Sequence, residues 1–479
     1  PSHTGGGTTR LVSKDWIIWA RTPDRFEAGT PAIINVIVFA RALQLVKQYG
    51  KDIFRERAIE KLTPDKILFH DELQNYSGTE LLEKLRQTII GRGVQVPTME
   101  GVKPFINLDN SASTPAFSPV WNTFRKALRQ PAEVQQEIIQ EVKRICANML
   151  GAPLATYDVL FTSNTTEAIN LAAKNLSREP AEGFDPVVLS TLLEHSSNDL
   201  PWRMIPGCSV IRLAVNDDGF ISLNELENLL KAYNLDSLHG NKQIRLLAIS
   251  GASNVLGICN NIAEIGRIVH KYGARLLVDS AQLVAHRSVD MESCGIDYLA
   301  FSAHKIYAPF GCGVLVAKKG LISFNADEPE LIRSSGEENA GGIAALGKAL
   351  LLLQRVGMNL VHEEEQALTA RLLFGLAQIP GLKIFGVNNP ESPAFAHKLG
   401  VIVFSLKGTM PEGLAKELAF RSGIGVRYGC HCAHIIVKHL LNVGPNLEQF
   451  QRLIVTLFPK LQLPGLVRVS LGLENTEAE

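Results

Sequence analysis

The sequence predicts an α/β fold in which a large domain, with a mostly parallel sheet wrapped by helices, precedes a smaller α+β C-terminal domain. Three observations predict it. A chain of 479 residues with 46% hydrophobic residues can bury a large core in two or three domains. From Phe105 onward, short apolar runs alternate with amphipathic helical patterns, as they do in βαβ units. After about residue 350, long helices separated by a few strands replace this alternation.

The large domain, predicted over residues 105–352, takes its elements from these runs. Apolar segments predict strands at residues 159–161, 187–189, 246–249, 276–278 and 298–300. Helical patterns lie between them, at residues 262–271 and in TTEAINLAAKNL, where we expect a helix from about Glu167. Because parallel strands end at one edge of a sheet, ligands are expected at their carboxyl ends. The smaller domain is predicted over residues 353–479, with a strand at 401–404.

Residues 1–50 contain a weak internal repeat. Gly29-Thr30-Pro31 aligns with Gly336-Glu337-Glu338, and Arg41-Ala42-Leu43 with Lys348-Ala349-Leu350, at one offset of 307 residues. Both copies are predicted to be a loop that enters an apolar helix. Chance similarity between two helices rich in Ala and Leu is the alternative to duplication.

The rest of the N-terminal region also has a predicted structure. Asn35 and Arg41 interrupt the apolar stretch at residues 32–46, which favours a buried or amphipathic helix over a membrane span. Residues 51–104 are charged and helix-prone and are predicted to be a helical linker. No signal peptide is recognisable, and the chain opens on Pro1 without a Met, so we expect a fragment or a processed product.

Composition excludes several classes of partner. Lys and Arg total 48 and Asp and Glu total 48, so no bulk positive field exists to hold nucleic acid or an anionic membrane. Seven scattered cysteines, an odd number, favour reduced thiols in a cytoplasm over a disulfide framework. Any anion must therefore be bound by a local site.

The strongest chemical signal is Phe301-Ser302-Ala303-His304-Lys305, which follows an apolar strand. A lysine at a strand end, beside hydroxyl and imidazole donors, suits a Schiff base to an aldehyde cofactor. A single such lysine is more commonly a solvated surface residue, so other segments must agree. Asp279 ends the strand RLLVD, with Gln282 three residues later. A carboxylate there can pair with a protonated pyridine nitrogen, although helix capping is a common role for it.

Polar groups upstream suit the other parts of such a cofactor. Ser163-Asn164-Thr165-Thr166-Glu167 lies at a helix start, where free N–H groups and hydroxyls can form a phosphate cradle as well as a helix cap. His195 follows the next strand and can stack on a flat ring, while Asn254 can donate to a ring oxygen.

The end of the chain supplies arginines and thiols. Arg468 presents a fork that matches a carboxylate, which suits an amino-acid substrate, although a lone Arg is commonly a surface ion pair. In RYGCHC, a thiol on a glycine-containing loop near arginines can be a reactive thiolate, although a single Cys is ordinarily buried and inert. The Cys-x-Cys with His431 and His434 also suggests zinc, but no second Cys pair lies at zinc-site spacing, so we expect no metal.

Seven segments together resemble a known family, the class V enzymes that use pyridoxal 5′-phosphate (PLP), and within it the cysteine desulfurase and selenocysteine lyase branch. They occur in the family's order as FTSNTTEAIN, LEHSSNDLPW, SNVLG, VDSAQ, FSAHK, RYGCHCAH and RVSLGLENT. The resemblance runs from about Leu108 to Thr476. It implies PLP fold type I, PLP as cofactor, an amino-acid substrate, a homodimer with shared active sites and, for a desulfurase, a sulfur-acceptor protein.

The resemblance also implies a role for each site residue. It makes Lys305 the Schiff-base lysine, Asp279 the partner of the pyridine nitrogen, and Cys432 the sulfur-accepting cysteine. The other roles are contact with the ring for Gln282, Asn254 and His195, with the phosphate for Thr165, Thr166, Ser302 and His304, and with the substrate for Arg468 and Arg427.

These roles imply a cysteine desulfurase, which converts L-cysteine to L-alanine and leaves a persulfide on Cys432. Because fold and cofactor do not fix the reaction, an epimerase, an aminotransferase or a selenocysteine lyase is the alternative. A catalytically silent paralogue that serves as a scaffold is a further one.

Three departures from the family bear on this interpretation. Where the family has a Gly-Thr-Pro-Asn-like turn that reaches the partner subunit's cofactor phosphate, this chain has Gly336-Glu337-Glu338-Asn339, whose carboxylates would repel a phosphate. Tyr428 and Cys430 replace the Thr and His that are usual beside the reactive cysteine.

The third departure is that GGGTTRLVSKDW and DRFEAGTPAI, near the N-terminus, resemble the stretch that normally follows the Schiff-base lysine. Residues 1–50 are therefore predicted to be a partial repeat of a class V segment. Either the natural protein is a tandem whose first unit is missing here, or Thr30 serves the phosphate that Glu337 cannot.

Overall fold

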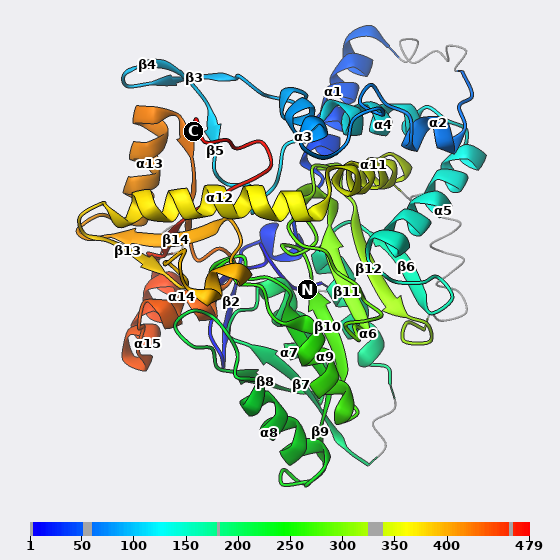
Figure 1. The fold of residues 1–479 in the computed structure, drawn as a ribbon. Coiled ribbons are helices and arrows are strands. Elements are labelled where there is room, and N and C mark those ends of the chain that lie inside the picture. The colour runs from blue at the N-terminus through cyan, green and yellow to red at the C-terminus, as the bar shows by residue number, and fades with distance from the viewer. Residues whose placement is uncertain (1–2, 51–59, 180–182, 324–338, 459–462) are drawn as a thin grey trace.

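The computed structural model describes residues 3–50, 60–179, 183–323, 339–458 and 463–479. Its largest sheet has seven strands in the order β6-β12-β11-β10-β9-β7-β8, and β12 alone runs antiparallel to its neighbours. The strands are β6 (Tyr157–Thr162), β7 (Asp185–Thr191), β8 (Ser209–Leu213), β9 (Lys242–Ser250), β10 (Arg275–Asp279), β11 (Tyr298–Ser302) and β12 (Gly313–Lys318). The mostly parallel sheet predicted from the sequence is therefore confirmed, with each predicted strand of the large domain in it (Figure 1).

Helices cover both faces of this sheet, which explains why its strands are almost continuously apolar. In β10, Leu276 and Val278 face one hydrophobic cluster, whereas Leu277 faces another, which contains the buried apolar residues of α6. The helices around the sheet are α4 (Ser118–Leu128), α5 (Ala132–Met149), α6 (Thr165–Leu176), α7 (Leu200–Arg203), α8 (Leu223–Asn234), α9 (Ile262–Lys271) and α11 (Ala340–Val356). The predicted helix at residues 262–271 is confirmed, and that of TTEAINLAAKNL begins two residues earlier than expected, at Thr165.

A second, four-stranded antiparallel sheet has the order β13-β14-β17-β16. Its strands are β13 (Leu382–Phe385), β14 (Val401–Leu406), β16 (Arg427–Gly429) and β17 (Leu466–Ser470), and its helices are α12 (Met358–Ala377), α13 (Pro411–Ser422), α14 (His434–Leu440) and α15 (Pro445–Leu457). A parallel pair between β5 (Ile106–Asn107) and β15 (Ile424–Gly425) joins the start of the large domain to this unit. The loops around the strand ends of the two sheets meet beside His195, where Ser196 N donates to Cys432 O over 2.7 Å.

In the segment predicted to be a helical linker, the described residues 60–104 contain two helices that pack against the large domain. Helices α2 (Pro64–Leu68) and α3 (Gly78–Gln87) place Ile67, Leu81 and Leu85 in the main hydrophobic cluster, each at 1% exposure or less. Apolar residues at helical spacing bury this segment because α11 offers it a matching surface. The stretch that follows forms a hairpin of β3 (Gln95–Thr98) and β4 (Gly101–Pro104).

The N-terminal region forms a hairpin of β1 (Thr9–Val12) and β2 (Ile17–Trp19), followed by α1 (Ile33–Tyr49), blue in Figure 1. The predicted helix is confirmed, and of the two predicted alternatives, buried or amphipathic, the buried one is excluded, since no residue of α1 is buried and Phe39 is 65% exposed. Helix α11 packs along α4 and α5, whereas α1 reaches the main hydrophobic cluster through the partly buried Ile34.

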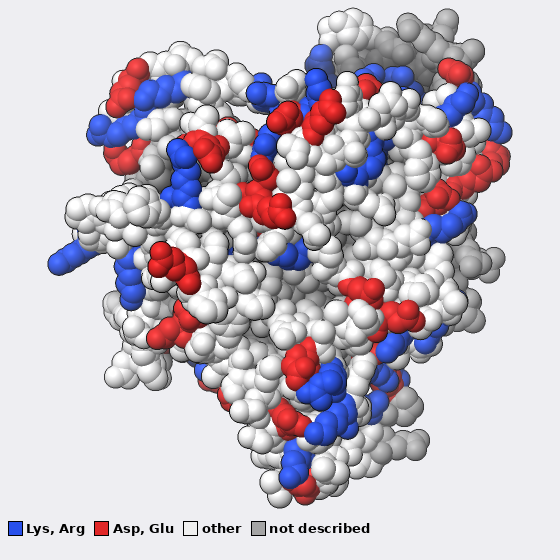
Figure 2. Space-filling model, viewed as in Figure 1, with Lys and Arg blue, Asp and Glu red and all other residues white. Residues whose placement is uncertain are grey.

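Charged side chains of both signs are interspersed on the face drawn in Figure 2, as the balanced composition leads one to expect. No single helix in the described ranges is long and apolar enough to cross a membrane, and only the pair of α11 and α12, bent by 78°, meets the test of length and composition.

Candidate active site

The carboxyl ends of the parallel strands open into a cavity of about 430 Å³ that the large domain, the small domain and the N-terminal segment line together. Every residue that the sequence singled out for catalysis or binding lines this one cavity. They are Thr165, Thr166, His195, Asn254, Asp279, Gln282, Ser302, His304, Lys305, Arg427, Cys432 and Arg468. Residues separated by up to 303 positions are thus brought together, mostly because the strands that carry them share an edge.

Lys305 lies in the short 3-10 helix Ala303–Lys305 that directly follows β11. Desolvation lowers the pKa of its amine to about 8, although the nearby Asp279 carboxylate acts in the opposite direction. Behind the lysine, the turn is fixed by hydrogen bonds: Tyr307 N donates to Thr114 Oγ1 over 2.7 Å, and Thr114 N donates to the His304 carbonyl over 2.9 Å.

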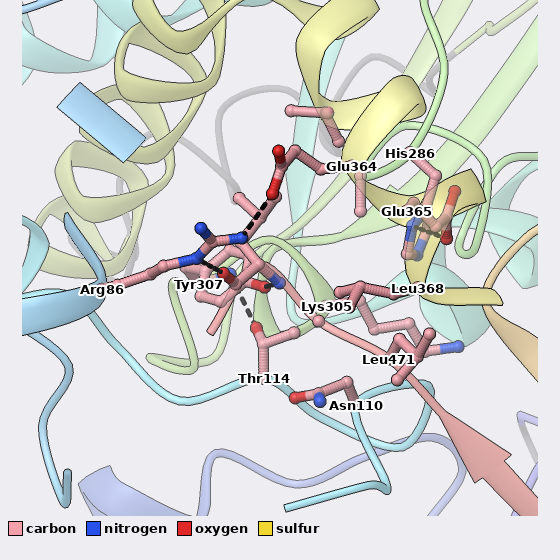
Figure 3. Close-up of a pocket in the computed structure, with 14 residues that line it drawn as sticks. Arg86, Asn110, Thr114, His286, Lys305, Tyr307, Glu364, Glu365, Leu368 and Leu471 are labelled. Carbon is pink, nitrogen blue, oxygen red and sulfur yellow. Dashed lines mark hydrogen bonds and ion pairs between the residues drawn. The ribbon is translucent and has the colours of Figure 1, made fainter. Parts of the chain in front are cut away.

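A second, small pocket reaches Lys305 from this rear side (Figure 3). Figure 3 shows Tyr307 and Thr114 beside it, with Arg86 paired to Glu364 over 2.9 Å. Tyr307 Oη accepts from Leu473 N over 2.5 Å, and Arg86 donates to the Leu473 carbonyl over 2.8 Å. Through Leu473, the lysine turn is therefore connected to α3 and, by the Arg86–Glu364 pair, to α12.

Two polar side chains stand at the end of β10. Asp279 is 6% exposed, and burial raises the pKa of its carboxyl. Its Oδ1 accepts a hydrogen bond from Ala281 N over 3.0 Å, so the carboxylate also stabilises the turn that follows the strand. Gln282 Nε2 donates to the Ser111 carbonyl over 2.8 Å.

The start of α6 provides a cluster of hydroxyls and amide donors. Thr165 N and Oγ1 lie 2.7 and 2.6 Å from Ser302 Oγ, and Thr166 Oγ1 lies 2.7 Å from Ser197 Oγ. Asn164 caps the helix by accepting from Glu167 N over 3.0 Å. Asn164 is therefore the residue that caps the helix, while the hydroxyls of Thr165 and Thr166 contact other hydroxyls at this end of the cavity.

Two histidines of the cavity are held neutral. Desolvation lowers the pKa of both His195 and His304 to about 3, so neither carries a proton charge near pH 7. His195 Nδ1 accepts from Ser197 N over 3.1 Å, which fixes the ring. His304 Nδ1 is buried without a hydrogen-bond partner and lines the cavity, so it is free to contact a bound group.

Arg468 and Arg427 share one carboxylate. Arg468, 3% exposed, donates to Asp109 Oδ1 over 2.9 Å and to the Asn254 carbonyl over 3.0 Å, while its Nε is buried without a partner. Arg427 lies 3.6 Å from Asp109 Oδ2, with about half of its side chain exposed. Two guanidinium groups against one carboxylate leave one positive charge unbalanced, which suits a carboxylate ligand.

Cys432 lies on a strained turn that faces the cavity. His431 and Cys432 both have a positive φ, 51° and 54°. The Cys432 carbonyl accepts from Ser196 N and Oγ, over 2.7 and 2.8 Å, and Asn254 Nδ2 donates to the His431 carbonyl over 2.9 Å. The turn is thereby pinned to the large domain while the Cys432 side chain stays partly accessible. Burial raises the pKa of the neighbouring Cys430 to about 11.

Sequence reasoning missed three contributors to this site. Asp109 is the shared partner of both arginines, and Ser197 bridges Thr166 and His195. Glu194, next to His195, is buried among Thr191, Asn198 and Ser250, and desolvation raises the pKa of its carboxyl to about 7. Glu194 and Ser197 belong to the segment LEHSSNDLPW, so their position close to His195 in the sequence is the signal that could have identified them.

All seven cysteines are unpaired. The part of the chain that the structure describes holds no group of three or more His, Cys, Asp or Glu side chains suited to a metal ion.

Comparison with known proteins gives a consistent result. The model of the family described as aminotransferase class-V matches residues 1–96 and 106–479. A cysteine desulfurase of Dickeya dadantii is 33% identical over 319 residues, which are 62% of this chain and 72% of that protein. A cysteine desulfurase of Escherichia coli O8 is 30% identical over 366 residues, 72% of this chain and 80% of that protein.

Solved structures share the fold. The apo structure of a cysteine desulfurase from Thermococcus onnurineus superposes with a TM-score of 0.64 at 23% identity, covering 78% of this chain and 91% of that one. A cysteine desulfurase from Escherichia coli gives a TM-score of 0.62 at 23% identity over the same shares. The predicted fold, a large domain with a mostly parallel sheet and a smaller α+β domain, is confirmed.

Proposed function

Because the chain belongs to the aminotransferase class-V family, we propose that it is a PLP-dependent enzyme that removes the sulfur of L-cysteine and leaves L-alanine. The observation that carries the proposal is the convergence, in one cavity, of a lysine of lowered pKa, an unbalanced pair of arginines and an accessible thiol. The curated relatives named cysteine desulfurase support the choice of substrate.

The residues present fit PLP. The cluster of hydroxyls and amide donors at the start of α6, with the unpartnered Nδ1 of His304, suits a phosphate. Asp279 is a buried carboxylate whose raised pKa marks the need for a cationic partner, which a protonated pyridine nitrogen would be. The neutral ring of His195 suits stacking, and Lys305 suits the covalent link.

The mechanism then follows from the residues of the chain. PLP supplies, when bound, an electron sink for the carbon that loses a proton. Arg468 and Arg427 bind the substrate carboxylate and so orient the amino acid. A lysine with a pKa near 8 is partly neutral at physiological pH, so Lys305 Nζ can take the Cα proton and later return one to the product.

Cys432 completes the reaction. Its Sγ, as thiolate, forms a bond to the substrate sulfur while the Cβ–S bond breaks. The electron pair stays on the carbon side, where a proton completes alanine, and Cys432 keeps the persulfide. Cys430, whose pKa is raised to about 11, is too poorly ionised to replace it.

The proposal is tested by adding L-cysteine to the PLP-loaded protein and assaying sulfide and alanine in the presence of a reductant. Cys432→Ala should lose sulfide production by two orders of magnitude or more while it keeps PLP, whereas the matched control Cys430→Ala should retain most of it. A keto acid or a D-amino acid as product would instead favour an aminotransferase or an epimerase. Equal turnover by the two variants would refute the sulfur-accepting role of Cys432.

A homodimer, a sulfur-acceptor protein and a cytoplasmic location remain parts of this proposal. The domain limits of 1–50, 51–104, 105–352 and 353–479 also stay predictions, although the seven-stranded sheet lies within the third of these ranges and the four-stranded sheet within the fourth.

A further inference from the structure

The N-terminal segment, residues 4–34, is built into the molecule rather than appended to it. Thr4 and Asn170 of α6 exchange two hydrogen bonds, of 3.1 and 2.8 Å. Leu11 and Val12 are 1% and 2% exposed, and Lys438 Nζ of α14 donates to the Val12 carbonyl over 3.0 Å. The segment thus contacts both the large and the small domain.

Two turns of this segment reach the cavity. Its lining includes Gly6, Gly7, Gly29, Thr30, Pro31 and Ile33, next to the catalytic candidates. One turn approaches the 3-10 helix Ser196–Asn198, where Gly6 N lies 3.2 Å from Ser197 Oγ. The other approaches the start of α6, where Asn164 Nδ2 lies 3.5 Å from the Thr30 carbonyl.

Glycine is required at these contacts. A Cβ on Gly6 would lie 2.7 Å from His195 Cε1, and one on Gly29 would lie 2.5 Å from Asn164 Oδ1, with Gly29 also at a φ of +84°. The two turns therefore approach His195 and Asn164 more closely than residues with a Cβ could. Among the six residues of the segment that line the cavity, Thr30 alone carries a hydroxyl.

The internal repeat explains the position of the segment. Helix α1 (Ile33–Tyr49) and helix α11 (Ala340–Val356) have the same bounds once the offset of 307 residues is applied. The residues that precede them, Ala32 and Asn339, both lie against Gly311, since a Cβ on Gly311 would be 2.5 Å from Ala32 Cβ and 3.6 Å from Asn339 Nδ2. The residues that precede the two helices therefore lie against the same turn, at Gly311.

From this geometry we infer that the N-terminal segment closes the phosphate end of the cavity from within the same chain, with Thr30 as its hydrogen-bonding residue. A single chain then retains PLP without a second copy. The inference rests on the proposed function, because it takes PLP as the ligand, and it assigns to the chain itself a wall that the family resemblance would give to a partner subunit. The corresponding turn of the second copy, Gly336-Glu337-Glu338, lies outside the described residues.

The test measures PLP affinity rather than turnover. The full-length chain is titrated with PLP, by absorbance, at protein concentrations from below to above the range in which sedimentation detects association. The affinity should not change with protein concentration. Thr30→Val should weaken PLP binding by about tenfold or more, the effect of losing a hydrogen bond to a charged group, and Thr30→Ser should restore it. Thr9→Val, in the same segment but outside the cavity lining, is the matched control and should bind as the native chain does.

A second readout needs no substitution. If the segment contacts the ligand, PLP must stabilise the segment in return, so hydrogen exchange of the amides in residues 5–8 and 28–34 should slow when PLP is added. Unchanged affinity in Thr30→Val, affinity that rises with dimer formation, or unchanged exchange in the segment would each overturn the inference while leaving the proposed function intact. A native chain that binds no PLP at all would overturn both.

Discussion

The lowered pKa of Lys305 gives the sharpest quantitative prediction. With a pKa of about 8, roughly a tenth of this amine is neutral at pH 7, compared with roughly one in 3,000 for an ordinary lysine of pKa near 10.5. Only the neutral amine attacks an aldehyde, so the rate of covalent PLP capture should rise about tenfold per pH unit up to pH 8 and then level off.

The assay mixes apo protein with PLP across pH 6 to 11 and follows the absorbance change, with borohydride reduction and peptide mapping to identify the modified lysine. The same pH series with Nα-acetyl-lysine in place of the protein corrects the rates for the protonation of PLP itself. Asp279→Asn should move the plateau to lower pH, because it removes the carboxylate that favours protonated Lys305. A corrected rate that keeps rising to pH 10 would refute the reasoning, since it would mean that the cavity does not desolvate Lys305.

Two further predictions concern charge. Arg468→Lys should raise KM for the amino-acid substrate by about tenfold or more, because a lysine cannot form two parallel hydrogen bonds to a carboxylate. Arg427→Lys should change KM less, since Arg427 is half exposed. A larger effect at Arg427 would contradict the assignment of Arg468 as the main substrate-binding arginine. Asp71→Asn should lower the free energy of unfolding by about 3–5 kcal/mol in urea titrations. The reason is that the charge of Lys348, which is 1% exposed and lies 2.6 Å from Asp71 in the native chain, would stay buried without a negative partner. A loss below about 1 kcal/mol would mean that solvent reaches the pair.

The sequence could predict the residues at strand ends because topology alone brings them together. Asp279, Ser302 and the lysine turn follow adjacent parallel strands, so local patterns were enough to place them at one edge. Asp109 could not be found in this way, since its pairing with Arg468 joins residues 359 positions apart across the two domains. Such a contact depends on how the domains close, which no local pattern encodes.

The pair of α1 and α11 shows why a pattern predicts a helix more securely than it predicts burial. Position 41 in α1 matches position 348 in α11, but Lys348 is buried against Asp71, whereas Arg41 is exposed and 3.2 Å from Gln44 on its own helix. Both helices are apolar, but α11 packs along α4 and α5, whereas α1 reaches the main hydrophobic cluster through the partly buried Ile34. The first copy therefore leaves its helix outside the core and places its loop, with Thr30, in the cavity. Two segments of similar sequence therefore have different roles in one molecule, because the burial of a helix depends on the surfaces against which it can pack.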